Sequence, residues 1–203
     1  MSRTFRRRMQ RGFNLIELLV ALSITATLMV ATMVAIRASF MAYQSTTEVA
    51  STNTIARLAM HRILTLIRTG QDFGPFPTDP NDPLIESEEI LIVTRDLDQI
   101  RITWIPDPPT PGFPVGNALY VEVNGGPAIL LLGGVVPTVD PVLGPIKPFA
   151  LEYLAGRQLY RVTIDLTIVP DDDMSVTLDG VNTQTIRLVA STMPRITAYK
   201  TDF

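Results

Sequence analysis

Cysteine is missing from the 203-residue chain, and histidine occurs once, at His61. Without cysteine there can be no disulfide bond, no cysteine-ligated metal and no thiol catalysis. His61 falls on the polar side of a predicted helix with no nucleophile near it in the sequence, so we expect it to be solvated. A glycine-rich phosphate loop, a zinc motif and a nucleophile elbow are also missing. The sequence therefore predicts that the chain is not an enzyme.

Acidic residues are missing from the N-terminus but abundant elsewhere. Residues 1–12 carry five arginines and no acid, whereas the chain from Phe13 onward carries 12 Lys and Arg against 20 Asp and Glu. An acidic body of this kind repels phosphate backbones. We therefore expect no nucleic acid among the partners.

Glycine and proline are absent from residues 13–69, and all 16 prolines lie from Gly70 onward. A stretch without a helix breaker predicts one continuous helix, roughly 85 Å long at about 1.5 Å per residue. Gly70 is a natural residue to follow its last turn, and Arg68 is favourable beside the negative end of the helix dipole.

The first part of this helix, Phe13–Ile36, is a run of 24 residues with one charge, Glu17. It spans roughly 36 Å as a helix, which is enough to cross a bilayer. The arginines before it are expected to stay in the cytoplasm by the positive-inside bias, so the bulk of the chain is exported.

Two simple interpretations of this run leave something unexplained. A cleaved secretory signal has a shorter apolar region, and Ile36-Arg37-Ala38 is a poor cleavage site. A plain signal anchor fits the length, but a carboxylate at Glu17 costs about 2.5–3.5 kcal/mol on insertion scales and gains nothing there. An acid in such a position calls for a partner.

A third interpretation comes from the segment Arg11-Gly12-Phe13-Asn14-Leu15-Ile16-Glu17-Leu18-Leu19-Val20, which resembles the cleavage site of type IV prepilins and type II secretion pseudopilins. The resemblance implies that a membrane peptidase cuts after Gly12, removes the leader and methylates the amine of Phe13. Glu17 then becomes the fifth mature residue and pairs with the N-terminal ammonium of a neighbouring subunit. Two buried opposite charges cost less together than apart.

The second part of the helix changes character. Residues 41–54 are mostly small and polar, whereas residues 55–67 are amphipathic. The apolar positions recur at the helical period and predict one stripe that packs on a sheet. The predicted stripe comprises Ile55, Leu58, Ala59, Ile63, Leu66 and Ile67.

The remainder of the chain has the pattern of short strands and long loops. In Gln158–Val169 the residues Tyr160, Val162, Ile164, Leu166 and Ile168 alternate with polar ones, so one face is predicted to be buried. The fold class expected is α+β, with a long N-terminal helix packed on an antiparallel, β-rich, pilin-like head. The predicted strands are Glu89–Thr94, Gln99–Ile105, Ala118–Val123, Ala128–Val136, Phe149–Leu154, Gln158–Val169 and Gln184–Ser191.

The expected organisation has four parts: a basic leader over 1–12, a transmembrane and assembly helix over 13–36, a helix continuation over 37–70 and an extracytoplasmic head over 71–203. The chain lacks the proline in the protruding half-helix and the C-terminal disulfide loop that major pilins often carry. Its ending, with Thr185–Val189 as a closing strand after an acidic loop, is similar to J-type minor pseudopilins and W-type minor pilins.

Two acidic loops carry oxygen ligands of the kind that calcium prefers. One contains Asp79 and Asp82, and the other contains Asp171 and Asp173. Neither follows a recognised calcium-loop pattern, so solvated loops without a cofactor are expected. The proline-rich segment Pro106–Pro114 predicts an extended surface loop, with a partner-binding role as the alternative.

The resemblance implies a minor pilin or pseudopilin that initiates or caps a type II secretion pseudopilus or a type IV pilus. Such a subunit sits in the cytoplasmic membrane with its head in the periplasm or outside, and then enters a filament. Its implied partners are the prepilin peptidase and methyltransferase, other pilin or pseudopilin subunits, an inner-membrane assembly platform and membrane lipid. The alternative is a signal-anchored extracytoplasmic hydrolase or binding protein with no filament role.

Overall fold

The computed structural model describes residues 14–79, 82–141, 144–154, 158–170 and 185–195. The chain divides into two compact units, Met1–Thr47 and Glu48–Phe203. Each unit is described by itself.

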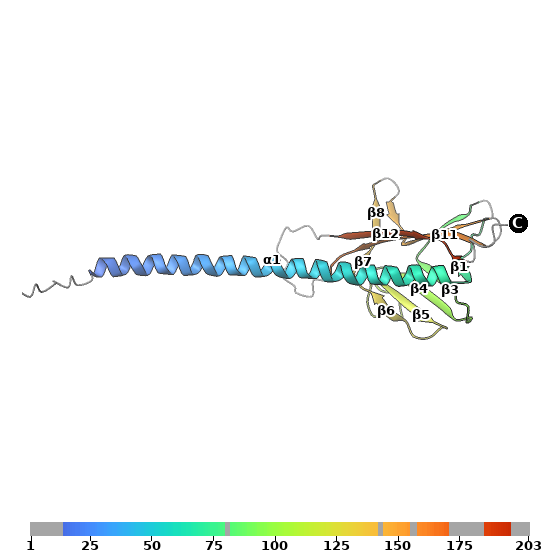
Figure 1. Ribbon diagram of the computed structural model, residues 1–203, viewed down its shortest axis with the longest axis horizontal. Coiled ribbons are helices and arrows are strands. Elements are labelled where there is room, and N and C mark those ends of the chain that lie inside the picture. The colour runs from blue at the N-terminus through green and yellow to red at the C-terminus, as the bar shows by residue number, and fades with distance from the viewer. Residues whose placement is uncertain (1–13, 80–81, 142–143, 155–157, 171–184, 196–203) are drawn as a thin grey trace, which may run out of the picture. The chain divides into compact units, whose positions relative to one another are not determined.

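One helix, α1 (Leu15–Thr69), belongs to both units (Figure 1). It begins after Asn14, whose carbonyl oxygen accepts a hydrogen bond from the Leu18 amide at 3.2 Å. It ends before Gly70, whose amide donates to the Leu66 carbonyl at 2.8 Å. The prediction of an unbroken helix over this stretch is confirmed, with the start two residues later than expected.

The other described residues of the second unit form two antiparallel sheets and a small hairpin. The first sheet has the order β1-β3-β4-β5-β6, and the second has the order β12-β11-β10-β2, with β7 also paired to β11. The first sheet consists of β1 (Asp72–Gly74), β3 (Glu89–Val93), β4 (Gln99–Ile105), β5 (Ala118–Val123) and β6 (Ile129–Leu132). The second consists of β2 (Leu84–Ser87), β7 (Val135–Val136), β10 (Phe149–Tyr153), β11 (Leu159–Ile168) and β12 (Ile186–Thr192), and the hairpin of β8 (Thr138–Asp140) and β9 (Gly144–Ile146).

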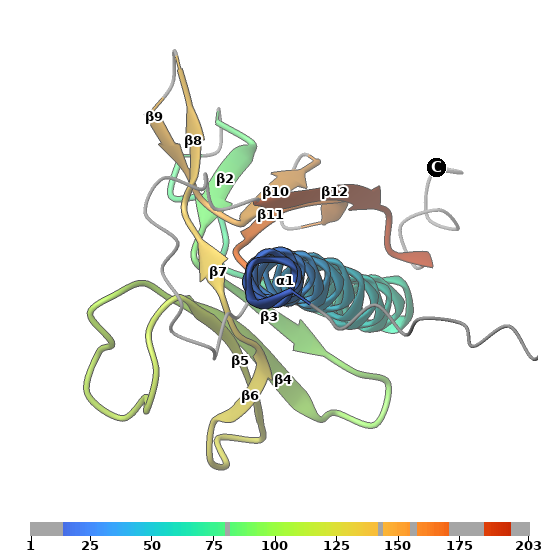
Figure 2. The same ribbon diagram turned by 90° about the vertical axis from the view of Figure 1, so that its left-hand side faces the viewer.

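These elements confirm the predicted α+β class, a long helix packed on an antiparallel head. Figure 2 shows α1 end-on, with the two sheets on either side of it. A single core joins the helix to residues of both sheets, among them Ile90 and Ile102 from the first and Phe149 and Ile164 from the second. The helix segment of this unit is therefore a structural part of the head.

The buried face of the helix differs from the predicted stripe. Ala59, Ile63 and Ile67 are buried as expected, and Leu66 is half-buried. Ile55 and Leu58, however, are 52% and 69% exposed. The core face instead continues through Ala56 and Met60. Ala56 is buried although its side chain is small, because it lies on the side of the helix that faces the sheets. Ile55 and Leu58 are more hydrophobic but lie on other sides, where close packing against the sheets is not available to them.

The predicted strand Ala128–Val136 is wrong, because it is two strands in different sheets. β6 pairs with β5 of the first sheet, whereas β7 pairs with β11 of the second. Gly133 and Gly134 separate them, and Gly134 has a left-handed φ of 72°. A Cβ at Gly134 would overlap the carbonyl oxygen of Val169, so only glycine permits the chain to change sheets here.

In β11 the predicted alternation holds with one correction. Val162, Ile164, Leu166 and Ile168 are buried, but Tyr160 is only half-buried. The register between β10 and β11 shifts between Glu152 and Tyr153, where Tyr153 is opposite Leu159 and Glu152 is opposite Arg161. This bulge moves Tyr160 off the core face, and Leu159 takes its place.

Two side chains link distant parts of the head. Trp104 donates its indole N–H to the Val135 carbonyl at 2.8 Å, which joins β4 to β7 of the other sheet. The Tyr153 hydroxyl donates to the Pro75 carbonyl at 2.7 Å, and its ring contacts Phe76. Burial raises the pKa of Tyr153 well above its ordinary value, with the charge of Asp72 adding to the effect, so this donor keeps its proton.

The proline-rich loop between β4 and β5 lies mostly at the surface, as predicted, but it is anchored. The ring of Phe113 contacts Tyr120 at 4.9 Å between centroids. The Tyr120 hydroxyl in turn donates to the Val115 carbonyl at 2.9 Å and accepts from the Val115 amide at 3.1 Å. The loop is therefore held to the outer face of the first sheet.

Candidate functional site

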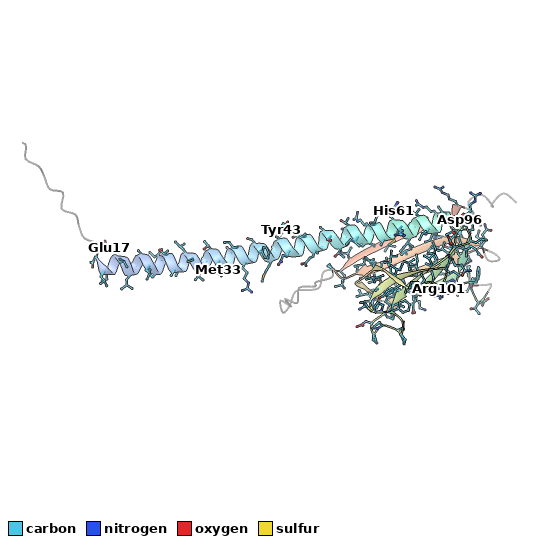
Figure 3. All side chains as sticks on the ribbon, turned by 90° about the horizontal axis from the view of Figure 1, so that it is seen from below. Glu17, Met33, Tyr43, His61, Asp96 and Arg101 are labelled. Atoms are coloured by element: carbon cyan, nitrogen blue, oxygen red, sulfur yellow. The ribbon has the colours of Figure 1, made fainter. Side chains whose placement is uncertain are left out.

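Apart from Asn14, the described part of the first unit is α1, and its apolar run is not covered by any of the residues that the structure describes. The most apolar window of 18 residues has a mean hydropathy of 2.3, and none of it is buried. By length and composition, α1 is one helix that could cross a membrane. Figure 3 shows Glu17, Met33 and Tyr43 in this order along it.

Glu17 lies in the first turn of α1, where the helix dipole favours a negative charge. Its Oε2 accepts a hydrogen bond from the Asn14 amide at 3.3 Å. Asn14 precedes the first helical residue and Glu17 follows three positions later, which is the glutamate half of a capping box. Glu17 thus has a local role that the sequence analysis missed, although an Asn with Glu three residues on could have predicted it.

This cap leaves the carboxylate of Glu17 accessible. The side chain is exposed, and 3.3 Å is long for a hydrogen bond to a charged acceptor. A cationic donor from a second molecule can therefore reach the carboxylate. The arrangement combines a capped helix start with an acid open to a partner.

The hydroxyl groups of the apolar run are all directed at the helix backbone. Thr25 donates to the Ala21 carbonyl at 2.7 Å, and the other three bond in the same way to a carbonyl three or four residues back. These are Ser23, Thr27 and Thr32. Every Ser and Thr in residues 14–36 is thus satisfied without water, as a hydrocarbon environment requires.

The predicted processing residues Gly12 and Phe13 lie outside the described residues, as do the loop acids Asp171 and Asp173. Asp82 lies within the described residues and stabilises the turn to which it belongs. Its amide donates to the Asp79 carbonyl at 3.2 Å, and its Oδ1 accepts from the Leu84 amide at 3.4 Å. Within the described ranges, no group of three or more His, Asp and Glu residues could hold a metal ion.

His61 lies on the exposed side of α1, where the sequence places it (Figure 3). Carboxylates on the surface of the head form ion pairs with arginine or lysine. Glu88 and Lys147 pair from outside the strands, and other pairs join neighbouring strands. The shortest pairs are Arg161 with Glu152 and Arg187 with Asp165, each at 2.7 Å. These are structural cross-strand pairs on the sheet surface.

Comparison with known protein families gives one match. Residues 7–33 match the model of the prokaryotic N-terminal methylation motif. The matched segment contains three of the five arginines before the helix, Glu17 and most of the exposed apolar run. It supports the prepilin and pseudopilin family, whose members are structural subunits anchored by a single N-terminal helix. Comparisons with curated proteins and with solved structures gave no match.

Proposed function

We propose that the protein is a minor pilin or pseudopilin, a structural subunit that initiates or caps a type II secretion pseudopilus or a type IV pilus. The observation that carries the proposal is the apolar first part of α1, which has Glu17 in its first turn within the matched methylation motif and which no described residue of the chain covers. A helix of this kind needs lipid before assembly and other helices after it.

In this proposal the peptidase removes residues 1–12, and Phe13 becomes the methylated N-terminus. Its ammonium then needs a counter-charge in an apolar setting, and the Glu17 carboxylate of a neighbour supplies it. Breaking such a buried pair by removing one partner costs about 3–5 kcal/mol, because the other charge is left unmatched. Methylation keeps the charge of the amine, so the pair survives it.

The organisation follows from this. Residues 13–36 anchor the subunit in the cytoplasmic membrane with the leader inside, residues 37–70 continue the helix, and residues 71–203 form the head in the periplasm or outside. The partners are the prepilin peptidase and methyltransferase, the other pilin-like subunits and the assembly platform. Within the family, the J-type minor pseudopilins and W-type minor pilins are the proposed subtype, because the chain has no cysteine for a disulfide loop and β12 follows the acidic segment 171–179 in the sequence.

Processing is the first test. Intact-mass analysis of protein extracted from membranes that contain the peptidase should give a chain that begins at Phe13 and carries one added methyl group. The variant Gly12→Val should keep its leader. An uncut chain in those membranes, or a chain cut near Ala38, would contradict the proposal.

The second test separates the two roles of Glu17. Glu17→Gln keeps a side-chain acceptor for the Asn14 amide but loses the charge, whereas Glu17→Ala loses both. If the carboxylate pairs with a neighbour's ammonium, both variants are inserted and processed yet co-purify poorly with companion subunits. If the carboxylate only caps the helix, Glu17→Gln assembles like the unchanged protein, and the proposed pairing is wrong.

A further inference from the structure

One arginine and two aromatic residues lie together on α1, directly after its apolar run. Arg37 is the only charged residue in the stretch 18–47. Phe40 and Tyr43 are the only Phe, Tyr or Trp residues in the 55 residues of the helix. All three fall within the short segment 37–43, which follows Ile36. We call Arg37, Phe40 and Tyr43 the arginine–aromatic cluster.

The cluster forms one exposed surface of the helix. Its members follow one another three positions apart, so at about 100° per residue they lie within an arc of about 120°. Arg37 is exposed, and Phe40 and Tyr43 are 59% and 69% exposed. None of the described residues forms a hydrogen bond or an ion pair with the Arg37 guanidinium or the Tyr43 hydroxyl. The hydroxyls of the apolar run, in contrast, are satisfied by their own helix.

The distance between Arg37 and Glu17 matches the thickness of a bilayer. At about 1.5 Å per residue, the rise of the helix from Glu17 to Arg37 is roughly 30 Å. The hydrocarbon core of a bilayer is also about 30 Å thick. Figure 3 shows Glu17 and Tyr43 along this part of α1. A shift of the helix by more than a turn in either direction would carry one of the two charges into hydrocarbon, so the charges favour one position across the membrane.

In that position the arginine–aromatic cluster meets the headgroup layer. This layer is about 5–8 Å thick on each side of the hydrocarbon, and the rise of the helix from Arg37 to Tyr43 is about 9 Å. A guanidinium binds phosphate through two parallel hydrogen bonds. Tyrosine is enriched at membrane boundaries because its ring is apolar and its hydroxyl can stay in water. The charge and the rings of the cluster therefore both fit a phospholipid surface.

We propose that Arg37, Phe40 and Tyr43 bind the headgroup layer of the leaflet on the head side, with the Arg37 guanidinium on lipid phosphate. This contact holds Glu17 at the opposite boundary of the bilayer, where water and headgroups still reach its carboxylate. The Glu17 carboxylate then enters apolar surroundings when the subunit joins others, and its pairing with an ammonium is needed at that point. The inference rests on the proposed function and names the lipid contact of the subunit before assembly.

The absence of native cysteine allows a direct test in the full-length chain. Single-cysteine variants are reconstituted in vesicles of phosphatidylethanolamine and phosphatidylglycerol and treated with a membrane-impermeant maleimide. Val34→Cys should react more than about tenfold more slowly than Ser51→Cys, the reference on the head side, because hydrocarbon excludes the reagent. Thr46→Cys, beyond the cluster, should react within about twofold of the reference. Rapid reaction at Val34→Cys, or slow reaction at Thr46→Cys, would overturn the proposal.

Removal of the charge then tests the contact with phosphate. Arg37→Leu joins the apolar run to Phe40, so reaction at Ala42→Cys should slow several-fold, whereas the matched change Arg57→Leu in the head should leave it unchanged. Native mass spectrometry in mild detergent should show several-fold less bound phosphatidylglycerol in Arg37→Leu than in Arg57→Leu. Equal lipid retention in the two variants would refute the phosphate contact.

The same vesicles separate this inference from the proposed function, because they contain neither the peptidase nor companion subunits. A boundary at Arg37 that forms only after companion subunits are added would refute lipid as the partner of the cluster. A chain that is cut after Gly12 and depends on Glu17 for assembly, yet has its boundary elsewhere in the vesicles, removes this inference and leaves the proposed function.

Discussion

The first and last parts of α1 share one helical backbone but differ in burial. Residues 15–36 are the most apolar part of the protein, and all of them are exposed. Residues 48–69 are more polar, yet they bury a narrow face of Ala56, Ala59, Met60, Ile63 and Ile67 in the core of the head. Hydrophobicity therefore does not by itself decide burial in this chain. The presence of a packing partner also decides it, and the described residues provide none for the first part of the helix.

The largest effect should come from placing a charge on the buried face. Ile63 is fully buried between the two sheets, so Ile63→Asp leaves an unpaired carboxylate in the core. We expect the free energy of unfolding of the head to fall by about 4–5 kcal/mol or more, measured by denaturant titration. Leu58→Asp is the matched control on the exposed side and should change it by no more than about 0.5 kcal/mol. Similar losses in both variants would show that the helix packs differently.

An aspartate placed in the apolar first part of α1 should affect membrane insertion and not the stability of the head. Leu28 is exposed in the middle of the apolar run, and Asp at the centre of a membrane helix costs about 2.5–3.5 kcal/mol. Leu28→Asp should therefore lower the fraction of protein that resists alkaline extraction from membranes, while the unfolding of the head stays unchanged. Leu28→Ala serves as the control for loss of side-chain volume. A destabilised head in Leu28→Asp would mean that the two halves are not independent.

A smaller effect is expected where the head half of the helix ends. A Cβ on Gly70 would lie 2.8 Å from Ile92 Cγ2 and from the ring of Phe73, although Gly70 has no left-handed φ. Glycine is needed there for space, and Gly70→Ala should destabilise the head by about 1–3 kcal/mol. At Gly133 a Cβ would meet nothing within 4 Å, so Gly133→Ala is a suitable control. Thermal unfolding of both variants would measure the difference, and an unchanged Gly70→Ala would contradict the packing.

The smallest effect concerns a hydroxyl in the membrane half. Thr25 bonds only to the carbonyl of Ala21 in its own helix, which already accepts a backbone bond, so Thr25→Val removes little. The free energy of membrane insertion should change by no more than about 0.5 kcal/mol. Co-purification with companion subunits should also be unchanged. Loss of co-purification without loss of insertion would reveal a bond from Thr25 to a neighbouring helix.

Long-range regularities of this fold were predictable from the sequence, and local irregularities were not. The lack of glycine and proline predicts α1, and the alternation in β11 predicts its buried face. Periodicity alone placed Ile55 and Leu58 in the core, because it cannot show which side of a helix meets a sheet. It also missed β1, β2, β8 and β9, which are only three or four residues long and lie among prolines. The bulge at Tyr160 depends on pairing with another strand, which single-strand patterns do not contain.

Some features of the candidate site could likewise be predicted from the sequence, and others could not. The membrane-spanning capacity of α1 could be predicted from charge and length, and the methylation motif from the resemblance of residues 11–20 to a prepilin cleavage site. The capping bond from the Asn14 amide to Glu17 was not predicted, although an Asn followed three residues later by Glu has the spacing of a capping box. Cleavage at Gly12 and the pairing of Glu17 with a neighbour stay predictions, because they involve a second molecule.

The hydrogen bond from Trp104 to Val135 gives the protein a built-in optical probe. Trp104 is the only tryptophan of the chain, so all indole fluorescence comes from the junction between β4 and β7. Since this side chain is buried between the two sheets, its emission should lie at short wavelength in the folded head and shift toward the red when the sheets separate. Selective excitation of this residue would therefore report the opening of the sheet junction during membrane extraction or assembly, with no label added to either half of the helix.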